Sequence, residues 1–290
     1  RRPTGPPPKG EGPSLPPART RDCAPRRIGR YLRCRMSTTQ YYESGALLAQ
    51  YLLFHYGDAG EVSPHAPPPP GSLEFPARCA ALCIESTPEP HRGRALDLGC
   101  AVGRAAYELS RGCGEVLGID YSATFVDACL ALKRDGRLKY RLPVEGDISL
   151  PSIARVPAGI SRDSVQFSRG DACALPDDIG TFGIVLMANL IDRLSDPAAC
   201  IARLPSLVRP GGTLVITTPA TWMPGFTPRE NWLGGRLVDG RPLRTIDALH
   251  EKLDPDFQAI GSHDMPFLIR EHARKFQWSV ALATVWRRRE

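Results

Sequence analysis

The spacing of hydrophobic residues along the chain changes at about residue 90. Before that point they recur three and four residues apart, which predicts amphipathic helices over residues 43–56 and 75–85. Gly57 ends the first helix, and Pro67–Pro70 form a stiff connection to the second. After residue 90, short apolar runs alternate with helical patterns. They predict strands over residues 94–98, 115–119, 165–169, 182–188, 213–217, 256–262 and 279–286, and helices over residues 102–111, 122–133 and 197–208.

Strands and helices that alternate at this spacing indicate an α/β protein with a doubly wound, Rossmann-like sheet covered by helices on both faces. We expect about seven strands, the last one antiparallel, in a domain over residues 91–290. Residues 36–90 are predicted to form an N-terminal helical cap. An insertion at about residues 220–244 carries Trp222, Phe226 and Trp232 among prolines and glycines. It could cover a substrate as a lid, although tryptophans can also simply attach an insertion to the body.

Residues 1–35 differ in composition from the rest of the chain. They hold eight prolines, four glycines and nine arginines with almost nothing to bury, which predicts a disordered basic tail. We expect Met36 to be the natural start and the residues before it to be a translated leader or a linker. A genuine basic arm is the alternative.

The positive charge of the chain is concentrated in that tail. The formal net charge is +6, but residues 1–35 alone contribute +8, so the other 255 residues sum to −2. A nearly neutral body argues against binding to nucleic acid. No stretch approaches the roughly 18 consecutive apolar residues that span a membrane. The nine cysteines are scattered without the spacing of a zinc site, so we expect free thiols in a reducing cytoplasm and no metal.

The segment 95–104 carries the clearest chemical signal. A buried strand leads into a glycine turn that opens a helix, and Asp97 within it is placed to face the positive end of a ligand. Glycine lets a ligand approach the backbone, and the helix N-terminus offers free N–H groups to an anion. The G-x-x-x-G spacing is neither a dinucleotide fingerprint nor a P-loop, so a small anion such as an amino-acid carboxylate fits better than a pyrophosphate. The turn residues are Gly99, Cys100, Ala101 and Gly103.

Acidic residues follow the next two strands. Asp120, before Tyr121, ends the second strand, where a carboxylate can accept hydrogen bonds from both hydroxyls of a ribose. Asp171 and Ala172 follow the third, where a carboxylate or the backbone could meet an adenine amine. Each alone is more often a turn or cap residue. In this order, however, they describe a cleft for S-adenosylmethionine (SAM).

This arrangement resembles the class I SAM-dependent methyltransferases over about residues 94–287. The resemblance includes that class's Pro-Gly-Gly turn, here Pro210–Gly212, before the fifth strand. It implies SAM as cofactor and S-adenosylhomocysteine (SAH) as product.

The flanking segments resemble one family more specifically, the methyltransferase of ovothiol biosynthesis, over residues 41–289. The segments that carry this resemblance are Tyr41–Ser44, Phe54–Gly57, Phe75–Cys79, Asn189–Leu194, Phe226–Gly235 and Ile269–Gln277. The resemblance implies methyl transfer from SAM to an imidazole ring nitrogen of 5-thiohistidine (4-mercaptohistidine), giving ovothiol A. This chain contains no sulfoxide-synthase segment, so it is expected to perform only the methylation, with a separate 5-histidylcysteine sulfoxide synthase as a possible functional partner.

Candidates for the substrate side follow from position. Asn189 and Asp192 come just after the fourth strand, at the edge where open α/β sheets bind ligands. Asn189 could bind the imidazole, and Asp192 could hold its N–H or the substrate ammonium, unless Asp192 is an N-cap or pairs with Arg193. Tyr42 and His55 belong to the cap, where a lone histidine is more often packed than catalytic. Arg270, read as part of a loose helical face with Glu271 and Lys275, could bind the substrate carboxylate or belong to a solvated ion-pair network.

Other functions fit the sequence less well. A methyltransferase of another small molecule keeps the cofactor site and changes the acceptor. A catalytically silent SAM-binding partner of a sulfoxide synthase is a second alternative. The glycine spacing of a nicotinamide dehydrogenase is absent from this sequence. Residues 189–192 also lack the Pro-Pro-aromatic face on which a nucleic-acid methyltransferase stacks a flipped base.

Overall fold

The computed structural model describes residues 42–290. The predicted tail over residues 1–35, and Tyr41 of the first family segment, lie outside the described residues. Among the described residues, none of the helices has the length and apolar character needed to cross a bilayer.

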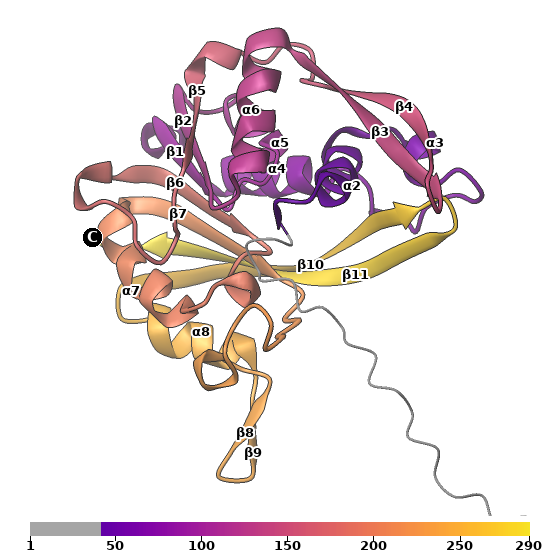
Figure 1. The fold of residues 1–290 in the computed structure, drawn as a ribbon. Helices are drawn as coiled ribbons and strands as arrows, with labels where there is room; N and C mark the ends of the chain where they lie inside the picture. The colour runs from indigo at the N-terminus through magenta and orange to yellow at the C-terminus, as the bar shows by residue number, and fades with distance from the viewer. Residues whose placement is uncertain (1–41) are drawn as a thin grey trace, which may run out of the picture. The chain divides into compact units, whose positions relative to one another are not determined.

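A seven-stranded sheet forms the centre of the fold, as predicted (Figure 1). Its order is β10-β11-β7-β6-β1-β2-β5, and β11 is antiparallel to β7 while the strands from β7 to β5 are parallel. The seven strands are β1 (Arg94–Leu98), β2 (Glu115–Asp120), β5 (Val165–Arg169), β6 (Phe182–Ala188), β7 (Val208–Thr218), β10 (Phe257–His272) and β11 (Lys275–Arg288).

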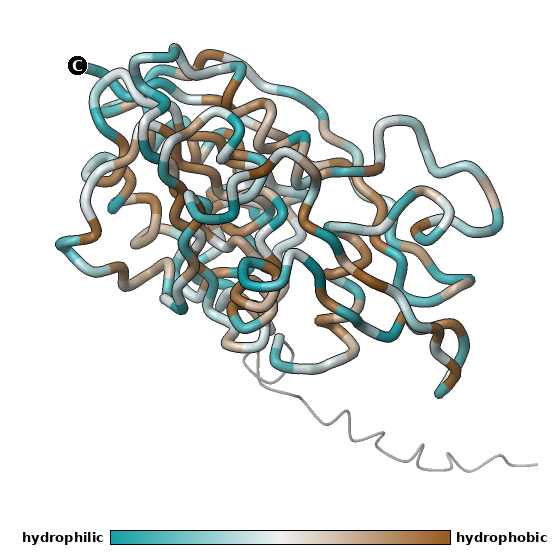
Figure 2. The backbone as a smooth tube through the Cα atoms, turned by 90° about the horizontal axis from the view of Figure 1, so that it is seen from above, coloured by the Kyte–Doolittle hydropathy of each residue, from teal (hydrophilic) through white to brown (hydrophobic). Residues whose placement is uncertain are grey.

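Helices cover both faces of the sheet (Figure 1). One face carries α4 (Phe75–Ser86), α5 (Arg104–Leu109) and α6 (Ala123–Asp135), and the other carries α7 (Pro197–Leu207) and α8 (Thr245–Leu253). The central strands are therefore buried on both sides, which is why they are mostly apolar rather than alternating. Many of the brown, hydrophobic segments accordingly lie in the interior of the molecule in Figure 2.

Local signals explain where these helices begin and end. Ser122 caps α6 by accepting a hydrogen bond from the Phe125 amide at 3.1 Å, and Gly136, with φ of 70°, follows its last turn. Asp196 caps α7 in the same way at 3.0 Å from the Ala199 amide. These caps lie where the sequence pattern places the helix boundaries.

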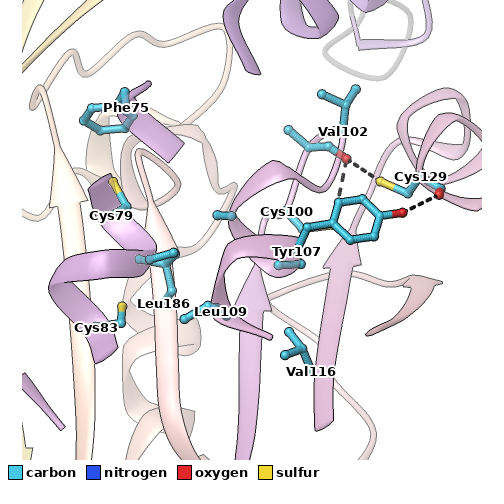
Figure 3. Close-up of a cluster of buried hydrophobic side chains, with 14 of the residues drawn as sticks. Phe75, Cys79, Cys83, Cys100, Val102, Tyr107, Leu109, Val116, Cys129 and Leu186 are labelled. Carbon is cyan, nitrogen blue, oxygen red and sulfur yellow. Dashed lines mark hydrogen bonds between the residues drawn. The ribbon is translucent and has the colours of Figure 1, made fainter. Parts of the chain in front are cut away.

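The N-terminal part divides between two locations. The first helix, α2 (Gly45–Tyr56), and the short α3 (Ala59–Val62) pack beside β10 and a separate hairpin of β3 (Arg137–Glu145) and β4 (Ile148–Arg155). The second predicted helix, α4, instead belongs to the layer on the sheet, where Phe75, Cys79 and Cys83 are buried (Figure 3). Only the first of the two predicted helices therefore lies where a cap over the strand ends could form.

Three features differ from the sequence prediction. The β3–β4 hairpin and α8 were not predicted, and the two C-terminal strands are longer than expected because they form one extended hairpin. The region around Arg270 is consequently strand, not helix. Within the insertion, β8 (Arg236–Val238) and β9 (Arg241–Leu243) form a small exposed hairpin. The short 3-10 turns are Glu89–His91, Arg162–Ser164, Asp177–Ile179, Ile191–Arg193 and Arg229–Asn231.

Candidate active site

Backbone strain gathers at the carboxyl ends of three adjacent strands. Ala101 after β1, Asn189 after β6 and Ala220 after β7 have φ of 47°, 53° and 51°, a region that side-chain-bearing residues seldom adopt. Because β7, β6 and β1 are neighbours, these residues share one edge of the sheet. Strained conformations of this kind persist at functional sites, and this is the edge where open α/β sheets bind ligands.

The glycine turn lies at the centre of that edge. Gly99 and Gly103 have φ of 78° and 84°, which favours glycine at both positions. A Cβ on Gly99 would stand 2.7 Å from the Leu190 side chain, and one on Gly103 would stand 2.8 Å from the Phe167 ring. The backbone and its protein neighbours thus already require these glycines. Cys100 is buried behind the turn (Figure 3).

Asp97 is the unusual residue of the turn. Its side chain is 1% exposed, and neither carboxylate oxygen has a hydrogen-bond partner of ordinary geometry among residues 42–290. Burial, and secondly the charge of Asp120, raises the pKa of Asp97 to about 7. An unpaired buried carboxylate is costly, so the site suits a ligand that brings a positive charge. The ammonium group of SAM provides one.

Asp120 ties the turn to the start of α6. Its Oδ2 accepts a hydrogen bond from the Ala101 amide at 2.8 Å, and its Oδ1 accepts one from the Ser122 amide at 2.9 Å. Burial raises the pKa of Asp120, while these hydrogen bonds oppose the shift. Each oxygen keeps further acceptor capacity, which is the chemistry that two ribose hydroxyls require. Tyr121, next in sequence, is half exposed and lies beside the Arg169 guanidinium.

The two residues predicted to meet the adenine, Asp171 and Ala172, differ in their surroundings. The Asp171 carboxylate accepts a hydrogen bond from the Cys173 amide at 2.8 Å, which is the turn that such residues ordinarily form. Ala172 is buried after it. Asp171 therefore shapes the loop after β5, and its contact with a cofactor stays a prediction.

On the other side of the turn, Asn189 is locked to β7. Its amide donates to the Thr217 carbonyl at 2.9 Å, and the Thr217 hydroxyl donates to Asn189 Oδ1 at 2.9 Å. The side-chain carbonyl is thus used within the protein. The side-chain NH2 group remains the part of Asn189 with which it can serve a ligand.

Asp192 is fully buried in the turn after β6. Its Oδ2 accepts hydrogen bonds from the Thr221 amide at 2.9 Å and from Arg193 Nη1 at 3.1 Å, so the ion pair with Arg193 is present. Its Oδ1 has no partner of ordinary geometry in the described chain. Burial raises the pKa of Asp192, and the Arg193 charge opposes this shift. One oxygen is therefore held by the protein and one is left for a donor.

The insertion is attached firmly to the body. Trp222 donates from its indole to the Thr245 hydroxyl at 2.9 Å and stacks on Trp232, with ring centroids 6.3 Å apart. The Thr227 hydroxyl donates to the Leu194 carbonyl at 2.7 Å. The two tryptophans thus serve attachment, and the residue that reaches the site is Phe226, whose ring lies 5.9 Å from that of Tyr42.

His55 is placed among aromatic rings of α2. It is 7% exposed, and burial, followed by the charge of Arg104, lowers its pKa to about 3. Its Nδ1 has no partner among the described residues. A histidine in this state is neutral at physiological pH and is a weak acceptor of protons. The structure therefore favours the packed role over that of a general base.

Arg270 requires a correction. It lies in β10 near α3, where Nη1 donates to the Glu61 carbonyl and Nη2 donates to the Pro143 carbonyl at 3.3 Å. The neighbouring Glu271 forms an ion pair with Lys275 at 2.6 Å. Because this segment is a hairpin and not a helix, the predicted helical face is absent, and the arginine is used to fasten α3 and β3 together.

Two residues of the site were not singled out for it by sequence. Arg193 was considered only as a partner of Asp192, yet its Nη1 also donates to the Thr221 carbonyl at 2.9 Å and its guanidinium lies 4.9 Å from the Phe226 ring centroid. Thr217 positions Asn189. A polar residue at the end of a buried strand was the available signal for Thr217. Among the described residues, no group of three or more His, Cys, Asp or Glu side chains could hold a metal.

The seven-stranded sheet with its antiparallel β11 and the glycine turn at its carboxyl edge form the Rossmann-like fold of the class I SAM-dependent methyltransferases. Comparison with known proteins agrees. Residues 96–216 match the family model described as a methyltransferase domain. A ubiquinone biosynthesis O-methyltransferase of Marinobacter nauticus is 22% identical over 125 residues, which is 43% of this chain and 43% of that protein. The match thus spans less than half the length of this curated relative.

Two solved structures are similar to this chain, and the first of them shows the fold. The [4+2]-cyclase SpnF has a TM-score of 0.54 and 17% identity, over 88% of this chain and 97% of that one. The N-methyltransferase NodS of Bradyrhizobium japonicum WM9 has a TM-score of 0.47 and 16% identity, over 75% and 96%. At such identities the likeness to SpnF is one of fold alone, so the acceptor of the methyl group must be argued from the site.

Proposed function

We propose that this protein transfers a methyl group from SAM to an imidazole ring nitrogen of 5-thiohistidine, giving ovothiol A and SAH. The observation that carries the acceptor side is the fully buried Oδ1 of Asp192, which has no hydrogen bond of ordinary geometry in the described chain, beside the strained Asn189. The flanking segments of the sequence, one of which contains Asn189 and Asp192, support the same substrate.

The free oxygen of Asp192 suits a ring that has one N–H and one lone pair. An imidazole that donates its N–H to Oδ1 turns its other nitrogen away from the carboxylate, with the lone pair unblocked. Asn189 can donate from its NH2 group to the thiolate or to the ring edge. Arg193, which the structure does place at this loop, takes over the carboxylate-binding role first considered for Arg270.

On the cofactor side, Asp97 would hold the ammonium group, the turn would hold the carboxylate and Asp120 would hold the ribose. SAM supplies an electrophilic methyl group, so the nitrogen lone pair forms the N–C bond while the C–S electron pair goes to sulfur. What the protein contributes is alignment and exclusion of water. An acidic thiol can lose its proton before binding, so no base from the chain is needed.

Calorimetric titration tests this proposal. SAH is titrated into the full chain first, and 5-thiohistidine is then titrated into the complex. We expect saturable binding of both, and methyl transfer when SAM replaces SAH. The variant Asp192→Asn should keep SAH binding and lose most of the 5-thiohistidine binding. Asp196→Asn is the matched control, because Asp196 is a nearby acid that only caps α7.

The outcomes separate the alternatives. SAH binding without 5-thiohistidine binding would favour another small-molecule acceptor. Binding of both without turnover would favour a silent partner of a sulfoxide synthase. If neither ligand bound, the assignment of the cofactor edge would be withdrawn.

A further inference from the structure

Glu43 makes an unusually complete contact with the start of α6. Its carboxylate accepts hydrogen bonds from the Ala123 amide at 2.9 Å, from the Thr124 amide at 3.0 Å and from the Thr124 hydroxyl at 2.5 Å. Burial alone would raise the pKa of Glu43, but these hydrogen bonds outweigh it and the pKa is lowered. A negative charge at a helix N-terminus is further stabilised by the helix dipole. The segment before α2 is therefore fixed to an element some 80 residues away in sequence.

The same segment meets the ribose-side acid. The Ser122 hydroxyl donates to the Tyr42 carbonyl at 3.2 Å, and the Ser122 amide donates to Asp120 Oδ1 at 2.9 Å. Asp120 also feels the Glu43 charge, which adds to the rise in its pKa. Residues 42–44, which we call the strap, thus contact Ser122, whose amide also donates to the carboxylate assigned to the ribose.

The Tyr42 ring extends from there across the strand ends. It lies 6.0 Å from the Phe125 ring of α6, which follows β2, and 5.9 Å from the Phe226 ring of the insertion, which follows β7. In the sheet, β1 and β6 stand between β2 and β7. With strands about 4.8 Å apart, this is a distance of roughly 14 Å. The contact between Tyr42 and Phe226 therefore joins the two sides of the edge that carries the glycine turn and Asn189.

We propose that Glu43 is a positioning residue that fastens the strap over the cofactor site. The inference rests on the proposed function only in that the covered ligand is SAM or SAH. With Glu43 bound to α6, Tyr42 closes the edge between α6 and the insertion and keeps water from the methyl group. The nucleoside leaves when this contact opens, so Glu43 sets the rate of product release.

The test measures how fast SAH leaves the full chain. The complex is mixed with excess SAM, and displacement is followed in a stopped-flow instrument. Glu43→Gln keeps the size of the side chain and removes its charge, which weakens three hydrogen bonds. We expect SAH to leave roughly tenfold faster, with a smaller change in the association rate, because one charged hydrogen bond is worth about that factor.

Matched variants separate fastening from simple stability. Tyr42→Ala removes the ring that contacts Phe125 and Phe226 and should also speed release. Asp196→Asn removes an equivalent carboxylate cap from α7, outside the strap. It should lower stability without changing the release of SAH.

Two negative results are distinguishable. If the wild-type chain fails to bind SAH, the proposed function falls and the strap inference falls with it. If the wild type binds SAH but both Glu43→Gln and Tyr42→Ala release it at the wild-type rate, the strap inference is overturned while the proposed function stands. Equal acceleration by Asp196→Asn would also overturn it.

Discussion

The substitution Asp97→Asn gives the sharpest test of the site, because it should strengthen the fold and weaken its function together. Asp97 is buried in β1, and neither carboxylate oxygen has a hydrogen bond of ordinary geometry in the described chain. Burial and the charge of Asp120 raise the pKa of Asp97 from 3.8 to about 7, although the Ala106 amide opposes this rise. An asparagine has nearly the same shape and no charge. The variant therefore removes the cost of ionising a buried carboxyl while leaving the glycine turn in place.

The size and sign of the effect follow from linkage. The folded-state pKa lies above the unfolded value, so Asp97 contributes stability below about pH 4 that is lost as the pH rises to about 7. A difference of about three pKa units corresponds to about 4 kcal/mol in full. The advantage of the variant in free energy of unfolding should thus grow from below about 2 kcal/mol at pH 5 to about 4 kcal/mol at pH 8.

The assay compares unfolding and binding at the same two pH values. Denaturant unfolding of the ligand-free proteins can be followed by the fluorescence of the four tryptophans. SAH titrations should show the opposite order. Wild-type affinity should rise with pH towards 7, because the ligand ammonium favours the ionised carboxylate, whereas the variant should bind weakly and without this pH dependence.

Two results would refute the reasoning. If the variant and the wild type lost stability in parallel between pH 5 and 8, Asp97 would not be the group that titrates there. If the variant bound SAH as tightly as the wild type, Asp97 would not face the ligand's positive end.

Three further substitutions test individual residues. Asp120→Ala should weaken SAH binding while the protein stays folded, and unchanged affinity in a SAH titration would remove Asp120 from the ribose role. His55→Phe should reduce the stability that is lost between pH 6.5 and about 3. A histidine with a lowered pKa contributes stability above pH 6.5, and this stability is lost on acidification by about 1.4 kcal/mol per pH unit. A changed pH profile of methyl transfer in this variant would instead support His55 as a general base. Arg270→Met should cost about 2–3 kcal/mol in free energy of unfolding, because it leaves the Glu61 and Pro143 carbonyls without their donor. The KM for the acceptor should not change. A raised KM in a protein of wild-type stability would show that Arg270 belongs to the site.

The central part of the fold was predictable because its signals are local. The strands β1, β5 and β6 have the bounds that the sequence predicts, since each is a short apolar run between turn residues. The β3–β4 hairpin was missed because it is largely exposed and packs on α2, so it lacks a continuous apolar run. The region of Arg270 has no distinct local period, and its pairing with β11 decides its structure.

In the candidate site, too, the residues that could be predicted are those with a local signal. The glycine turn and Asp97 come from one contiguous segment and were predicted from it. The contact of Glu43 with α6, and that of Arg193 with Thr221, join residues far apart in sequence, and neither residue type reveals its partner. Only the packing of α2 and of the insertion against the strand edge determines them. Sequence reasoning thus named the glycine turn, Tyr42 and the insertion, and missed the contacts of Glu43 and Arg193 that hold them.

Asp97 in β1 and Asp192 after the neighbouring β6 share one property, a buried carboxylate oxygen without a hydrogen bond of ordinary geometry in the described chain. Interiors rarely leave such groups unmet, because each costs free energy that a ligand can recover. A ligand group without a hydrogen-bond donor recovers nothing there, whereas an ammonium group or an N–H does. Both Asp97→Asn and Asp192→Asn should therefore stabilise the ligand-free protein, the first losing SAH and the second losing the acceptor. If both lost the same ligand, the edge would hold one subsite, and the division between cofactor and acceptor would be wrong.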